Sequence, residues 1–152
     1  MGLLNVSTLC LILTLMASSS HAAEMGRVLD AVSWAESKGV PTTGDGGRSV
    51  SSYQIYDITW RHITEIRKAK GLKTYPHSKH PSESVAREYA KSYLEWLSEM
   101  HQKHRLARPS PEVLYLMYTM GWSAARAIGF DYRLAPSYKQ NGVKRFRLKY
   151  YE

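Results

Sequence analysis

The sequence predicts a domain of the α+β class that is mainly α-helical, with a small β-hairpin or folded loop after its first helix. Apolar residues recur at helical spacing in most segments beyond residue 23. One glycine-rich stretch interrupts this pattern between the first and second helical segments. The roughly 130 residues after residue 22 are enough for one domain with its own core. We therefore expect a single domain over residues 23–152.

The first 22 residues are typical of a secretory signal peptide. They contain no Lys, Arg, Asp or Glu, carry an apolar run from Leu9 to Met16, and place small residues at Ser20 and Ala22. The run is shorter than the roughly 20 apolar residues of a membrane-spanning helix. We expect cleavage after Ala22 and export to the periplasm or the exterior, with no transmembrane segment in the mature chain. Cys10, the single cysteine, would be removed with the signal.

The first helix of the mature chain is predicted over residues 24–38. Val28, Leu29 and Val32 recur at helical spacing, and Gly39 with Pro41 ends the pattern. The stretch 39–52 holds four glycines and several serines and threonines, which predicts the hairpin or folded loop.

Five further helices follow in the pattern. The second covers 56–68, with Ile58, Ile63 and Ile66 expected to face the core, and a basic surface loop occupies 71–81. Ser82 opens the longest helix, which runs to about residue 104. Prolines then precede a helix over 112–120, and further helices are predicted over 123–128 and 136–150.

The net charge of +8 falls entirely after residue 22. A basic exported protein is attracted to polyanions over long range. Outside a membrane, anionic cell-wall polymers are the expected partners. Nucleic acid is not expected, because basic and aromatic residues interleave without a recognisable binding platform.

Three short segments carry a family resemblance. They are residues 35–39 (AESKG), 44–47 (GDGG) and 53–55 (YQI). This order resembles the lysozyme-like superfamily, especially the branch of soluble lytic transglycosylases and goose-type lysozymes. Residues 117–121 (MYTMG) are similar to a second segment of that branch, and Tyr138 with Val143 to its closing run. The resemblance implies a lysozyme-like helical domain that cleaves the glycan strands of peptidoglycan.

The resemblance makes Glu36 the general acid. Cleavage of a glycosidic bond requires a carboxylic acid that protonates the leaving oxygen, and partial burial favours the protonated form of such an acid. Asp45 matches the aspartate that positions the attacking water in goose-type relatives, and Asp57 is a second candidate. Transglycosylases need no second carboxylate, because the 6-hydroxyl of the sugar attacks. The sequence leaves hydrolysis and transglycosylation open.

The substrate is expected to contact a cleft lined by Ser49, Ser51, Tyr53, Gln54 and Tyr118. Gln54 would hydrogen-bond the polar groups of the sugar, and the tyrosines would offer flat surfaces to its rings.

The sequence departs from the family pattern at three places. Ser51-Ser52 replaces a glycine, Thr119 replaces an asparagine, and Lys38 is inserted into Glu-Ser-Gly. These departures leave open an alternative in which the chain is a weak or inactive peptidoglycan-binding module of the same fold.

Other polar and aromatic residues have structural interpretations. The histidine pairs 77/80 and 101/104 belong to no recognised ligand motif, so neither a metal nor a cofactor is expected. Tyr89, Tyr93, Trp96 and Trp122 are interpreted as core aromatics. The basic run 139–149 is interpreted as a solvated helix face, and the mature chain as a monomer.

Overall fold

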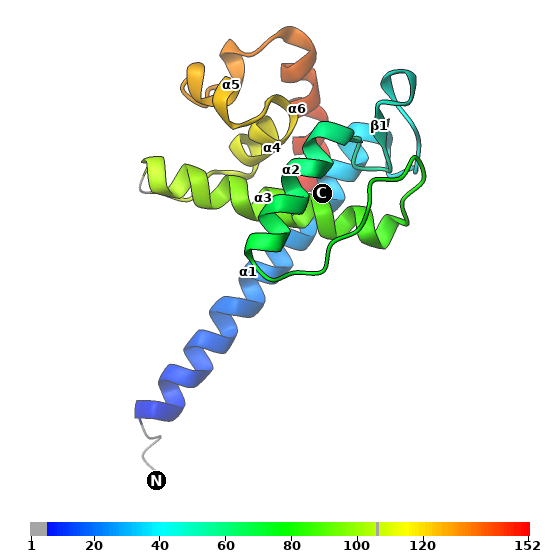
Figure 1. Cartoon of the computed structure of the whole chain (residues 1–152). Helices are drawn as coiled ribbons and strands as arrows, with labels where there is room; N and C mark the ends of the chain where they lie inside the picture. The colour runs from blue at the N-terminus through cyan, green and yellow to red at the C-terminus, as the bar shows by residue number, and fades with distance from the viewer. Residues whose placement is uncertain (1–5, 106) are drawn as a thin grey trace.

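The computed structural model describes residues 6–105 and 107–152, with side chains from residue 22 onward. The chain forms a mainly helical α+β domain with one small antiparallel hairpin between its first two helices, as predicted (Figure 1). Its elements are α1 (Val6–Ser37), η1 (Asp45–Gly47), β1 (Ser49–Val50), β2 (Ile55–Tyr56), α2 (Asp57–Ala69), α3 (Glu83–Arg105), α4 (Pro111–Met120), α5 (Trp122–Ala127), η2 (Tyr132–Leu134) and α6 (Ser137–Tyr150).

The predicted signal peptide is described only in part, as backbone from residue 6 onward. Residues 1–5 and the side chains of residues 6–21, Cys10 among them, are not described. In the part that is described, no helix combines the length and the apolar character needed to cross a bilayer.

The core lies where α1, α3, α4 and α6 pack together. α1 packs most extensively on α6, and α4 lies against α3, α5 and α6. Val32 of α1, Leu97 of α3, Leu116 of α4 and Phe146 of α6 are fully buried at these contacts. The packing brings the C-terminal end of α1 close to α4 and α6, although these helices begin more than 70 residues later in the sequence.

The hairpin is shorter and later than predicted. Ser49 pairs with Tyr56 and Val50 with Ile55, so the second strand lies beyond the predicted stretch 39–52. Ser51 and Gln54 take left-handed backbone conformations, with φ of 68° and 49°, in the turn that joins the strands. A turn built on left-handed non-glycine residues leaves no signal in glycine content, which explains the misplaced boundary.

The boundaries of α2 to α6 agree with the predicted ranges to within about two residues. The first helix was predicted over residues 24–38, but α1 begins at Val6 and so continues through the predicted cleavage position after Ala22.

The prediction that Ile58 faces the core was wrong, because this residue is 78% exposed. It lies in the first turn of α2 and points to solvent, and Trp60 occupies the core position instead. Ser82 accepts a hydrogen bond from the Val85 amide and so caps α3, as predicted.

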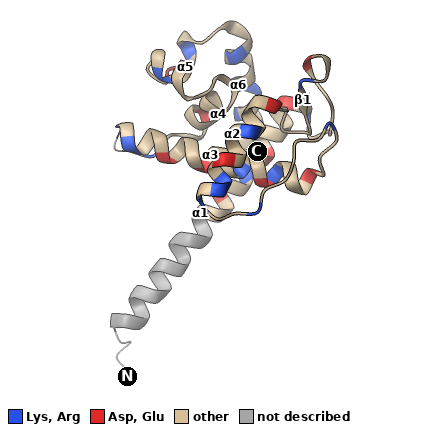
Figure 2. Ribbon diagram, viewed as in Figure 1, with Lys and Arg blue, Asp and Glu red and all other residues tan. Residues whose placement is uncertain are grey.

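The net positive charge is unevenly distributed over the helices. Figure 2 shows Lys and Arg interspersed with Asp and Glu on α2 and α3. In contrast, α6 carries Lys139, Lys144, Arg145, Arg147 and Lys149 and no acidic residue. A large part of the net charge of +8 therefore lies on α6.

Candidate active site

A cavity of about 610 Å³ lies where the end of α1, the hairpin, α4 and the start of α6 meet. Segments separated by up to about 100 residues contribute to it. Its lining residues are Glu36, Asp45, Ser49, Gln54, Ile55, Tyr56, Thr59, Tyr93, Tyr118, Thr119, Met120, Gly121, Tyr138 and Lys139. Five of the seven residues predicted for the site, namely Glu36, Asp45, Ser49, Gln54 and Tyr118, therefore share one cavity.

Glu36 is half-buried in the last turn of α1. The helix ends directly after it because Lys38 and Gly39 adopt left-handed conformations, with φ of 59° and 75°. Oε1 of Glu36 accepts a hydrogen bond of 2.6 Å from the Tyr115 hydroxyl. Oε2 has no hydrogen-bond partner among the described residues and is the oxygen available to a ligand.

Tyr115 is a buried residue of α4 that fixes the position of the Glu36 carboxyl group. Its ring stacks on Phe146, with ring centroids 4.8 Å apart. A Cβ atom at Gly142 of α6 would lie 2.9 Å from the Tyr115 hydroxyl, so glycine is needed there for space. Burial raises the pKa of Tyr115, and the negative charge of Glu36 raises it further. The hydroxyl therefore keeps its proton and serves Glu36 as a donor.

Ser37 ties the end of α1 to the hairpin. Its Oγ donates to the Ser52 carbonyl oxygen at 2.9 Å. Ser52 in turn donates from its hydroxyl, at 2.6 Å, and from its amide, at 3.2 Å, to the Glu83 carboxylate of α3. Ser52 thus links α1, the hairpin and α3 around Glu36.

Gln54 organises the loop rather than offering free hydrogen bonds. Its Oε1 accepts from the Ser49 hydroxyl at 2.6 Å, and its Nε2 donates to the carbonyl oxygens of Thr42 and Ser51. A Cβ atom at Gly44 would overlap the Gln54 amide, so the glycine makes room for this network. Ser49 and Gln54 line the cavity as predicted, but they bind each other and hold the loop that carries Asp45.

Asp45 begins η1 in a left-handed conformation, with φ of 50°. Its carboxylate lines the cavity and has no hydrogen-bond partner among the described residues. Asp57, the other candidate, lies elsewhere: it pairs with Arg61 on α2 and lines a separate groove. Of the two aspartates, Asp45 shares the cavity with Glu36.

Tyr53 and Ser51 do not line the cavity, so their predicted place in the cleft wall was wrong. Both are buried, at 3% and 4% exposed. The Tyr53 hydroxyl accepts a 2.9 Å hydrogen bond from Arg87 of α3, and the Ser51 hydroxyl accepts one from the Tyr53 amide. The left-handed turn at Ser51 breaks the alternation of a strand and sends both side chains inward.

Tyr118 does line the cavity. Its hydroxyl donates to the Tyr53 carbonyl oxygen at 2.8 Å, which fastens α4 to the hairpin turn. Burial raises the pKa of Tyr118 well above its usual value, and the Glu36 charge adds to the rise. Trp122 packs partly buried against the core, in agreement with its structural interpretation.

Two residues of the site were missed by the sequence analysis. Tyr115 lies three residues before Tyr118 and so on the same helix face, a signal that could have indicated it. Lys139 was interpreted only as part of a basic run, yet it lines the cavity and donates to the Thr119 carbonyl oxygen. Burial lowers the pKa of Lys139, while the charges of Glu36 and Asp45 act in the opposite direction.

No protein-family model, curated protein or solved structure matches this chain. The resemblance to the lysozyme-like superfamily stays a proposal, and the arrangement of the cavity residues is what supports it.

Proposed function

We propose that this chain is an exported glycosidase of lysozyme-like fold that cleaves the glycan strands of peptidoglycan, with Glu36 as the general acid. One observation carries the proposal. Glu36 presents an unpartnered carboxyl oxygen to a polar cavity that also contains the unpartnered carboxylate of Asp45. Most glycosidases use a pair of carboxyl groups in one site to cleave the glycosidic bond.

In this mechanism the Oε2 oxygen of Glu36 protonates the glycosidic oxygen as the bond to the anomeric carbon breaks. Tyr115 holds the other oxygen, which leaves the carboxyl group one productive orientation. The cavity of about 610 Å³ falls within the usual size range of small-ligand sites and suits a short run of sugar rings. Tyr93, Tyr118 and Tyr138 offer the rings flat apolar surfaces.

The position of Asp45 in the cavity favours hydrolysis over transglycosylation for the second half of the reaction. A water molecule beside its carboxylate would add its oxygen to the anomeric carbon and give its proton to Asp45. Attack by the 6-hydroxyl of the sugar would make Asp45 dispensable and leave an anhydro end. The identity of the new end therefore reports which nucleophile is used.

The test compares the wild-type protein with Glu36→Gln on purified cell walls. The amide cannot donate the acid proton, so release of soluble muropeptides is expected to fall at least about 10²- to 10⁴-fold. Circular dichroism and thermal unfolding should show that the fold is retained. Mass spectrometry of the products distinguishes a reducing end from an anhydro end. Full activity of Glu36→Gln would show that the acid is a different residue.

A second candidate function is a peptidoglycan-binding module without catalysis. It is favoured by the Tyr115 hydrogen bond, which also suits a purely structural Glu36, and by the departures at Ser51, Ser52 and Thr119. Under this alternative the protein sediments with insoluble peptidoglycan, and no fragment appears in the supernatant.

A further inference from the structure

A second, wider hollow runs along α2, between that helix and the segment of residues 75–79; we call it the α2 groove. Its volume is about 1100 Å³. Tyr56, at the end of the hairpin, lines both the α2 groove and the cavity that contains Glu36. A ligand bound near Glu36 can therefore continue into the α2 groove without leaving the surface.

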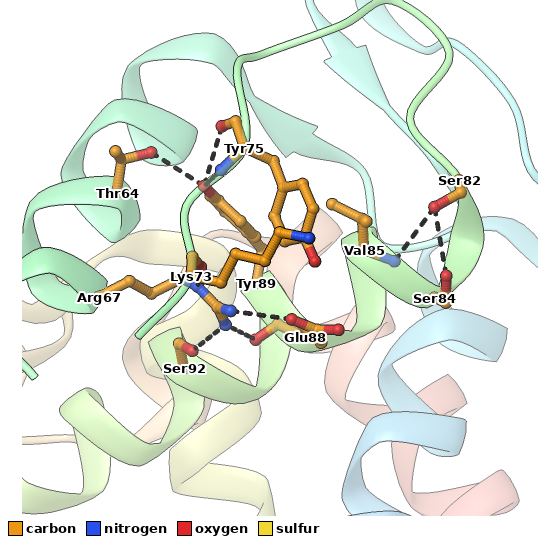
Figure 3. A network of polar contacts seen from close by, with 10 residues as sticks. All are labelled: Thr64, Arg67, Lys73, Tyr75, Ser82, Ser84, Val85, Glu88, Tyr89 and Ser92. Atoms are coloured by element: carbon orange, nitrogen blue, oxygen red, sulfur yellow. Dashed lines mark hydrogen bonds and ion pairs between the residues drawn. The ribbon is translucent and has the colours of Figure 1, made fainter. Parts of the chain in front are cut away.

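The far wall of the groove is held in place although it has no regular secondary structure. Figure 3 shows Arg67 of α2 reaching to α3, where it donates to Ser92 and to the Glu88 carboxylate, each at 2.8 Å, and its Nε donates to the Lys73 carbonyl oxygen. The Tyr89 hydroxyl accepts from the Tyr75 amide at 2.8 Å and donates to the Tyr75 carbonyl oxygen at 2.9 Å. A wall fixed in this way lowers the entropic cost of binding a ligand.

The surface of the groove is apolar with a basic excess. Ile58, Tyr75 and Pro76 supply apolar area. Its two acidic residues are neutralised on α2 itself, since Asp57 pairs with Arg61 and Glu65 with Lys68.

Two further cations of the groove, Arg48 and Lys79, have no acidic partner among the described residues. Arg48 uses its Nε to hold the Asp45 carbonyl oxygen, which leaves the rest of its guanidinium for a ligand. The groove thus suits an extended ligand with small apolar groups and carboxylates.

We infer that the α2 groove binds the stem peptide of peptidoglycan, a short acidic peptide rich in alanine that is attached to the sugars. This inference rests on the proposed function, because the glycan bound near Glu36 is what brings the stem peptide to the groove. Alanine methyl groups would lie on Ile58 and Tyr75, and the peptide carboxylates would face Lys79 and Arg48.

The experiment measures binding of a fluorescein-labelled tetrapeptide, L-Ala-γ-D-Glu-meso-diaminopimelate-D-Ala, by anisotropy with the full chain. The double variant Ile58→Asp/Lys79→Glu places two carboxylates in the groove at exposed positions that the core does not use. Its Kd is expected to be at least about tenfold higher than that of the wild type. Lys103→Glu, the substitution made at Lys79 but placed in the last turn of α3, is the control and should stay within about twofold.

The same proteins are then assayed on intact peptidoglycan and on glycan strands from which the peptides have been removed. The double variant should raise KM on intact peptidoglycan and leave cleavage of the bare glycan unchanged. Peptide binding that is not saturable, or that Lys103→Glu weakens equally, would overturn the inference. Cleavage of bare glycan without peptide binding removes the inference and keeps the proposed function. Peptide binding without cleavage of either substrate would contradict the proposed glycosidase function and leave the inferred peptide site standing.

Discussion

The Glu36 cavity and the α2 groove differ in what surrounds their carboxylates. In the groove, Asp57 and Glu65 each form an ion pair with a cation three or four residues along the same helix. In the cavity, Glu36 is held by a neutral hydroxyl, and Asp45 has no hydrogen-bond partner among the described residues. An ion pair within the helix neutralises each carboxylate of the groove, whereas the two carboxyl groups of the cavity have no cation in an ion pair with them among the described residues. This contrast is the reason for proposing chemistry at the cavity and ligand recognition at the groove.

The largest expected effect separates the two aspartates. Asp45→Asn should lower kcat for peptidoglycan hydrolysis by roughly 10²- to 10³-fold, because the amide cannot accept the proton of the attacking water. Asp57→Asn removes an exposed ion pair with Arg61 and a 3.6 Å contact with His77, both outside the cavity, and should change kcat by less than about twofold. The rate of muropeptide release by each variant is the measurement. An equal decrease in kcat for both variants would contradict the proposed difference between the cavity and the α2 groove.

A second test concerns the buried hydroxyls beside Glu36. Burial raises the pKa of Tyr115 and of Tyr118, with the Glu36 charge next in size, so both stay protonated in the folded state when unfolded tyrosines ionise. The unfolded state then binds fewer protons, and stability falls as pH rises above about 10. In that range each of these tyrosines should lower the free energy of unfolding by about 1.4 kcal/mol per pH unit.

Lys139 contributes with the opposite sign, because its pKa is lowered by burial, and its contribution is complete near pH 10.5. Chemical denaturation from pH 10.5 to 11.5, with tyrosinate absorbance followed in parallel, isolates the tyrosines. The chain has eleven tyrosines, and exposed ones such as Tyr138 ionise in the folded protein. Absorbance that reaches the value for all eleven before the protein unfolds would show that Tyr115 and Tyr118 are accessible to solvent base.

The sequence predicted the members of the cavity better than their contacts. Glu36, Asp45, Ser49, Gln54 and Tyr118 were singled out by a resemblance that no comparison tests, and the structure gathers them in one cavity. Their partners depend on backbone conformations and helix packing that no periodicity encodes.

The errors illustrate this limit. Tyr53 was expected in the cleft, but the left-handed turn at Ser51 directs it toward Arg87. Tyr115 and Lys139 reach the site only because α4 and α6 pack against the end of α1. Ile58 was expected in the core because periodicity cannot distinguish the first turn of a helix from its middle.

A third, smaller effect is expected from the hydroxyl that orients Glu36. Tyr115→Phe should lower kcat about tenfold with KM nearly unchanged, since the carboxyl group loses its fixed orientation while the cavity keeps its shape. Tyr150→Phe is the matched control, because Tyr150 also stacks on Phe146 and its hydroxyl is not hydrogen-bonded to Glu36. Steady-state kinetics on soluble glycan separates the two parameters. A change confined to KM would assign Tyr115 to substrate binding instead.

The smallest effect concerns the joint between α1 and the hairpin, a contact with no counterpart in the α2 groove. Ser37→Ala removes the 2.9 Å hydrogen bond to the Ser52 carbonyl oxygen and should lower the free energy of unfolding by about 1 kcal/mol. Ser33→Ala, one helical turn earlier, is the control, because its hydroxyl makes no hydrogen bond among those described. Urea denaturation measures both. If the two variants unfold alike, the joint adds nothing to stability, and Glu36 is held by Tyr115 and the packing of α1 alone. If Ser37→Ala also loses activity severalfold at a temperature where it stays folded, Ser37 positions the loop that carries Asp45 relative to Glu36 for the proposed reaction.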